Sequence, residues 1–135
     1  MLKTYHGSCH CGLVKFEVRM DFKGSSKCNC RFCWKQRNWN AQVDPANFTL
    51  LSGEETLGDY SRTGEGFENH HRFCRKCGTP THGHGHIDAM GGAYLGVRIA
   101  ALDDLTVEEL MSEPITLCDG LNDNWWNVPE DTRHL

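Results

Sequence analysis

Long hydrophobic runs are absent from this sequence of 135 residues. No apolar stretch approaches the roughly 20 residues that a membrane-spanning helix requires. The first residues, Met1–His6, also lack the apolar core of a signal peptide. We therefore expect a cytoplasmic protein without a membrane partner, whose cysteines stay reduced.

Positive charge is also scarce. The chain has 14 Lys and Arg against 18 Asp and Glu, for a formal net charge of −4. Proteins that grip phosphates usually carry the opposite sign, which argues against nucleic acid as a partner. The exception is a basic cluster around the cysteines, composed of Lys27, Arg31, Lys35, Arg37, Arg72, Arg75 and Lys76. These side chains either offset the charge of bound thiolates or form an anion-binding rim around a pocket.

Apolar residues are few as well, at 39% of the chain. This is on the low side for a globular protein. The length suits one domain, so we expect residues 1–135 to form a single domain. Something besides apolar burial must then help to hold that domain together.

Hydrophobic periodicity predicts a mainly β fold. Residues 13–22 alternate apolar and charged side chains, as a half-buried strand does. Gly24–Ser26 is expected to break the chain after this strand. Further strands are predicted over 48–51, 57–62, 67–73, 79–86 and 94–99. Of these, 57–62 and 67–73 are expected to form a hairpin.

One or two short helices are expected. Thr106 and Glu109 fit a capping box, and Pro114 stops the helix that follows. A second helical turn is predicted from Cys33 to about Asn38. The architecture is therefore mainly β with little helix.

Cysteine, by contrast, is plentiful, with eight in the chain. Seven fall into three clusters with the patterns C-x-C, C-x-C-x-x-C and C-x-x-C. Two residues between thiolates let both sulfurs reach one zinc ion. A lone C-x-x-C would also suit a redox dithiol, but three clusters in one short chain point to zinc.

Counting ligands predicts two zinc ions per chain. The C-x-C and C-x-x-C clusters together supply four thiolates, which close one tetrahedral structural site: Cys9, Cys11, Cys74 and Cys77. The C-x-C-x-x-C cluster supplies three thiolates and leaves a vacancy, as catalytic zinc sites do: Cys28, Cys30 and Cys33. The alternative is a second structural site, closed by a histidine or by Cys118.

Histidines offer rival ligands. His82, His84 and His86 alternate with glycines, so in a strand all three rings would point to one face. They form either a further metal site or a set of surface histidines. The flanking glycines weaken the strand, which favours surface histidines.

The three cysteine clusters, in this order, resemble those of the glutathione-dependent formaldehyde-activating enzymes, a family that also includes centromere protein V. The resemblance lies in the stretches Gly7–Phe16, Cys28–Cys33, Phe48–Tyr60, Phe73–Gly78, Gly96–Arg98, Leu102–Asp104 and Asp119–Gly120. It therefore spans nearly the whole chain. One departure is Asn29, at a position that is commonly histidine in relatives.

The resemblance implies a β-tent fold of packed antiparallel sheets pinned by zinc. It also implies the division of labour that ligand counting gives, with one structural and one catalytic zinc. The family reaction joins glutathione and formaldehyde reversibly as S-(hydroxymethyl)glutathione, a carbon–sulfur lyase step in reverse. The resemblance thus predicts a lyase whose partners are a glutathione-like thiol and an aldehyde.

A non-catalytic, zinc-stabilised binding module is the alternative. The basic cluster and the Trp125–Trp126 pair could serve such a module, since aromatic and arginine side chains can stack on a ligand. The same tryptophans could instead pack the C-terminal segment onto the sheet. Uptake of a thiol at the three-cysteine site separates the enzyme from the module.

Overall fold

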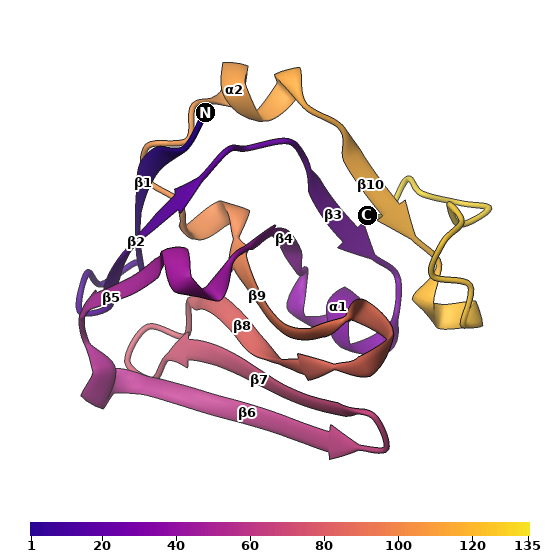
Figure 1. Ribbon diagram of the computed structural model, residues 1–135, viewed down its shortest axis with the longest axis horizontal. Coiled ribbons are helices and arrows are strands. Elements are labelled where there is room, and N and C mark those ends of the chain that lie inside the picture. The colour runs from indigo at the N-terminus through magenta and orange to yellow at the C-terminus, as the bar shows by residue number, and fades with distance from the viewer.

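The computed structural model describes residues 1–135 and contains two β-sheets (Figure 1). The small sheet is antiparallel, with the strand order β1-β2-β5. Its strands are β1 (Lys3–Ser8), β2 (Lys15–Met20) and β5 (Phe48–Ser52). It is formed early in the chain, within the first 52 residues.

The large sheet has seven strands in the order β10-β3-β4-β9-β8-β7-β6. They are β3 (Ser25–Cys28), β4 (Trp39–Val43), β6 (Leu57–Gly64), β7 (Phe67–Cys74), β8 (Pro80–Ile87), β9 (Gly92–Arg98) and β10 (Ile115–Cys118). All neighbours are antiparallel except β10 and β3. The predicted mainly β fold of antiparallel sheets with two short helices is confirmed.

The helical elements are short. The α-helices are α1 (Arg31–Gln36) and α2 (Val107–Ser112). Single 3-10 turns occur at Pro45–Asn47, Glu54–Thr56, Asp88–Met90, Ile99–Ala101 and Gly120–Asn122. None of these helices has the length and apolar character needed to cross a bilayer.

The main core lies between the two sheets. The alternation predicted for 13–22 is borne out in β2, where Phe16, Val18 and Met20 are buried. They form one cluster with Leu95 and Val97 of β9. Phe16 and Val97 have no exposed surface, so this contact between β2 and β9 fixes how the small sheet sits on the large one.

The predicted capping box starts α2. Thr106 Oγ1 accepts a hydrogen bond from Glu109 N at 3.1 Å, and Glu109 Oε2 accepts one from Thr106 N at 3.1 Å. The other carboxylate oxygen of Glu109 accepts from Lys3 Nζ at 2.7 Å and from the Tyr5 hydroxyl at 3.0 Å. The cap therefore also docks α2 onto β1.

Two local predictions are corrected by the structure. Gly24–Ser26 does not simply break the chain, because Ser25 and Ser26 open β3, where β10 and β4 supply ladder partners on both sides. The helix expected from Cys33 begins two residues earlier, at Arg31. Cys30 caps it, with its sulfur accepting a hydrogen bond from Cys33 N at 3.4 Å.

Candidate metal centres

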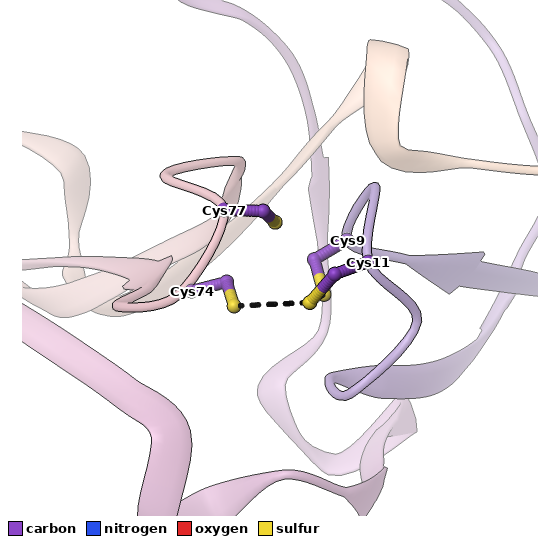
Figure 2. A group of neighbouring side chains, drawn as sticks. All are labelled: Cys9, Cys11, Cys74 and Cys77. Atoms are coloured by element: carbon purple, nitrogen blue, oxygen red, sulfur yellow. Dashed lines mark hydrogen bonds between the residues drawn. The ribbon is translucent and has the colours of Figure 1, made fainter.

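The end of β7 and the loop after β1 bring four cysteines together (Figure 2). Their sulfurs all lie within 4.8 Å of one another. The sulfur of Cys11 is 3.6 Å from that of Cys9 and 3.7 Å from that of Cys74. Zn–S bonds of about 2.3 Å in a tetrahedron place sulfurs about 3.8 Å apart. Cys9, Cys11, Cys74 and Cys77 therefore fit a zinc ion.

The backbone around these sulfurs is already arranged to support thiolates. Gly12 and Gly78, with φ of 82° and 78°, supply left-handed turns just after Cys11 and Cys77. Val14 N donates to the sulfur of Cys9 at 3.2 Å. A hydrogen bond from the Thr79 side chain, with further backbone donors, lowers the pKa of Cys77 to about 5.

The second group contains the other three predicted ligands, with sulfurs again within 4.8 Å of one another. Cys28 ends β3, Cys30 caps α1 and Cys33 lies in its first turn. Cys30 N donates to the sulfur of Cys28 at 3.3 Å, and Asn38 Nδ2 donates to that of Cys33 at 3.5 Å. This group can hold a second ion through three thiolates.

The three thiols influence one another strongly. Hydrogen bonds from the side chains of Cys28 and Cys33 lower the pKa of Cys30 to about 2. Hydrogen bonds with Cys28 and then with Cys30 raise the pKa of Cys33. One thiol therefore ionises readily, while a cation is needed to hold all three as thiolates.

The group of close ligand atoms around Cys30 has three members, and neither Cys118 nor a histidine belongs to it. Cys118 is nevertheless a neighbour, because β10 pairs with β3 in a register that sets Cys118 opposite Cys28. Its side chain is half-buried, and burial raises its pKa. Cys118 is thus a packed thiol beside the site.

The turn between Cys28 and Cys30 is held from outside by the segment that follows β10. Asn29 Nδ2 donates to Asp119 Oδ1 at 2.8 Å, and Asn29 Oδ1 accepts from Leu121 N at 2.9 Å. A Cβ at Gly120 would lie 2.6 Å from the sulfur of Cys28, so only glycine lets this segment approach so closely.

A cavity of about 230 Å³ lies beside the three-cysteine group. Cys30 and Cys33 form part of its wall, and the large sheet supplies much of the remainder. Its other polar lining residues are Asn38, Asn40, Gln42, Arg62, Asn69, His71, Tyr94 and Arg98. A second cavity, of about 210 Å³, lies on the Cys28 side and includes Lys27 and Arg37 of the basic cluster.

His71, just before the third cysteine cluster in the sequence, is a residue of the cavity wall. Its ring packs 4.0 Å from the ring of Phe32, centroid to centroid, and its Nε2 atom is buried without a hydrogen-bond partner. Burial, reinforced by the charges of Arg62 and Arg98, lowers its pKa to about 4. The imidazole is therefore neutral at physiological pH.

The histidines of β8 do not form a surface set. His82 is 6% exposed and packs against Phe48, with ring centroids 4.4 Å apart, and burial lowers its pKa to about 3. His84 is half-buried and stacks on His70 at 4.9 Å, while only His86 is exposed. The glycines between them do not stop β8 from pairing with β7 on one side and β9 on the other.

Fold and site together define a class: a mainly β protein with one group of four cysteines and one of three, each suited to zinc. The sequence profile of the glutathione-dependent formaldehyde-activating enzymes matches residues 4–116. The chain belongs to this family. It is also similar to a protein of Rhodobacter sphaeroides of known crystal structure, with a TM-score of 0.66 and 29% identity over 82% of this chain and 99% of that one.

Proposed function

We propose that this protein is a zinc-dependent carbon–sulfur lyase that acts on adducts of a thiol, glutathione or similar, with an aldehyde such as formaldehyde. The observation that carries this proposal is the position of the three-cysteine group in a cavity wall. Family membership supports the same reaction class, since the family is named for formaldehyde activation with glutathione. The reaction is then like that of S-(hydroxymethyl)glutathione synthase, and we place it in the cytoplasm.

We assign different roles to the two cysteine groups. The four-cysteine group joins the loop after β1 to the turn after β7 and lines neither of the two cavities described above, so its role is structural. The three-cysteine group offers three ligands and faces both cavities, so its role is catalytic. One zinc ion at each group makes two per chain.

Cys28, Cys30 and Cys33 would hold the zinc ion, which would stabilise a substrate sulfur as a thiolate. In the synthetic direction the sulfur forms a bond to the aldehyde carbon, and the proton that left the thiol ends on the carbonyl oxygen. The lyase direction breaks that C–S bond and returns the proton to sulfur. Three cysteinates give a zinc centre of net charge −1, which suits thiol exchange better than hydrolysis.

The chain's own residues prepare this site for a thiol. Asn38 Nδ2 and the backbone N–H groups of Cys30 and Cys33 donate hydrogen bonds to cysteine sulfurs, which stabilises their thiolate forms. Phe32 lies between Cys30 and Cys33 in the sequence and packs on His71, and both side chains line the cavity. Together they form an aromatic part of the wall beside the three cysteines.

Cobalt substitution tests the proposal, because cobalt–thiolate absorption grows with each sulfur bound. Adding glutathione to the cobalt protein should increase this absorption, and formaldehyde added next should be consumed only when thiol and protein are both present. Cys30→Ser should abolish both effects, whereas the control Cys118→Ser should keep them. A spectrum that no thiol changes, including free cysteine, would favour a non-catalytic zinc-stabilised binding module.

A further inference from the structure

The cavity beside the three-cysteine group has an unusual charge for this chain. Its lining includes two arginines, Arg62 and Arg98, and none of the 18 Asp and Glu residues. The chain as a whole has a formal net charge of −4. The cavity is therefore a cationic concavity in an acidic protein, and such a concavity attracts anions.

Arg98, at the end of β9, is the more buried of the two. Arg98 is 8% exposed, and no carboxylate forms an ion pair with its guanidinium. Its guanidinium makes one long hydrogen bond, from Nη1 to the carbonyl of Gln36 at 3.4 Å. A guanidinium carries five N–H donors, and burying the charge unpaired is costly. Most of its donors thus remain for a ligand.

Arg62 stands at the rim, on the edge strand β6. Its guanidinium carbon lies 4.7 Å above the ring centroid of Phe32, one of the two residues between Cys30 and Cys33. A cation within about 6 Å of an aromatic ring centroid is attracted to the face of the ring, which favours this position of the guanidinium. Arg62 is thereby positioned next to the metal ligands with its charge facing no acid.

A row of amides completes the polar wall. Asn38 donates to the sulfur of Cys33, Asn40 Nδ2 donates to Asn38 Oδ1 at 3.3 Å, and Gln42 Nε2 donates to Asn40 Oδ1 at 3.3 Å. These bonds orient the side chains of β4 along the cavity. A chain of hydrogen bonds therefore links the sulfur of Cys33 to the amides of Asn38, Asn40 and Gln42 along the cavity wall. Both arginines line the same cavity.

A zinc ion held by three thiolates has net charge −1 and offsets one of the two guanidiniums. The other positive charge remains without a counter-charge in the cavity. We propose that Arg98 and Arg62 form a subsite for a carboxylate carried by the substrate, with Arg98 binding it through its two-pronged face. This inference rests on the proposed function and adds to it the residues that recognise the acid group of the substrate.

The size of the cavity limits the rest of that substrate. Pockets for drug-sized ligands are roughly 300–1,000 Å³, and this one is about 230 Å³. At about 30 Å³ for each water molecule, the cavity has room for roughly seven or eight water-sized groups, so the enclosed portion of the substrate is smaller than a whole glutathione molecule. The carboxylate belongs either to the thiol or to the aldehyde.

Binding of a simple acid tests the subsite apart from any chemistry. Propionate and its neutral isostere propionamide are titrated into the zinc-loaded protein by calorimetry. Propionate should bind and propionamide should not, and Arg98→Gln should weaken propionate roughly tenfold or more, since a charge-assisted bond is lost. Arg98→Lys keeps the positive charge but cannot donate two parallel hydrogen bonds. Its affinity for propionate should therefore lie between that of the parent and that of Arg98→Gln. Equal affinity for both compounds would overturn the proposal.

Two further variants protect this test from a folding defect. Arg62→Gln changes an exposed residue and should weaken propionate several-fold while Tm stays as in the parent. Arg19→Gln, at an exposed position of β2, is the matched control and should change nothing. Propionate affinity unaltered in both Arg62→Gln and a folded Arg98 variant would contradict the subsite.

Kinetic arms then identify the source of the carboxylate. One pair compares 3-mercaptopropionate with 2-mercaptoethanol, each with formaldehyde, and another compares glyoxylate with acetaldehyde, each with 2-mercaptoethanol. Arg98→Gln should raise KM for the acid member of one pair and leave its neutral partner unchanged. No turnover in any arm, with propionate binding intact and dependent on Arg98, would refute the lyase while upholding the anion subsite.

Discussion

The side-chain amide of Asn29 donates a hydrogen bond to Asp119 Oδ1 at 2.8 Å, across 90 positions of sequence. The same carboxylate accepts two bonds from Asn122 Nδ2, at 3.1 and 3.0 Å. Hydrogen bonds from Asn29 and then Asn122 hold the pKa of Asp119 below its usual value. The turn that carries Cys28 and Cys30 is thus braced by a segment from the far end of the chain.

Removing this brace should loosen the three-cysteine site. Asn29→Ala deletes the donor to Asp119 and leaves Leu121 N without its acceptor, so we expect Tm to fall by about 2–5 °C. Zinc at the second site should exchange faster with a chelator. Thermal unfolding and chelator kinetics measure the two effects. Lys35→Ala, exposed on α1, is the control, and Asn29→Ala that behaves like this control would show that the brace does not support the site.

The four-cysteine group should decide whether the protein folds. Structural zinc contributes roughly 10–16 kcal/mol of apparent binding free energy in small peptides, which equals or exceeds the net stability of about 5–15 kcal/mol of a typical domain. Cys77→Ser should therefore give insoluble or unfolded protein, as judged by expression and circular dichroism. Cys118→Ser should fold normally. A soluble Cys77→Ser protein with the parental Tm would remove the structural role.

The three-cysteine group should behave differently. Cys30→Ser should leave a folded protein, because its ligands span only six residues and tie no distant segments together. Metal analysis should fall from near two zinc ions per chain to near one. If Cys30→Ser unfolds as severely as Cys77→Ser, the second group is structural and the lyase proposal loses its main support.

His70 should make stability depend on pH near neutrality. Its Nε2 lies 2.9 Å from Glu68 Oε1 and its Nδ1 lies 2.8 Å from Asp59 Oδ2, and both acids, Glu68 first, raise its pKa above 6.5. A pKa raised on folding stabilises the protein fully below pH 6.5, and this contribution is lost as pH rises through the folded value.

The measurement for His70 is thermal unfolding between pH 6 and pH 9. The gap in Tm between the parent and His70→Gln should be largest near pH 6 and shrink toward pH 9. Replacing both acids, with Asp59→Asn and Glu68→Gln, should flatten the dependence in a protein that keeps His70. A gap that stays constant over this range would contradict the assignment of this ion pair.

The strands that the sequence predicted best are those with a strong local pattern. The alternation in 13–22 found β2, and the Gly-containing turn after residue 62 found the β6–β7 hairpin. β3 and β10 escaped prediction because each has only four residues, and their pairing is parallel and 90 positions apart. Nothing in a local window specifies a partner at that distance.

The cysteine groups were predictable because ligand number and spacing are local properties, and the structure brings together the same seven sulfurs. Their surroundings were not. The basic cluster drew attention to residues near the cysteines in sequence, such as Arg31 and Lys35, which are exposed on α1. Arg62 and Arg98 come from β6 and β9, and only the folded sheet sets them beside Cys33.

Trp125 and Trp126 have different surroundings in the structure. Trp125 lines the cavity beside Gly120 and is 45% exposed, whereas Trp126 is 86% exposed. The predicted packing of this pair onto the sheet is therefore wrong for Trp126. Two adjacent residues in a turn face different ways, and the sequence carries no periodic signal for that.

The span between the two halves of the four-cysteine group sets an order of events during synthesis. Cys11 and Cys74 are 63 positions apart, which a ribosome covers in about 3–13 s at about 5–20 residues per second. Cys28, Cys30 and Cys33 leave the ribosome almost together, inside that interval. A nascent chain therefore presents a complete three-thiol chelator before its four-thiol site exists. Metal binding at the three-thiol group can thus precede metal binding at the four-thiol group.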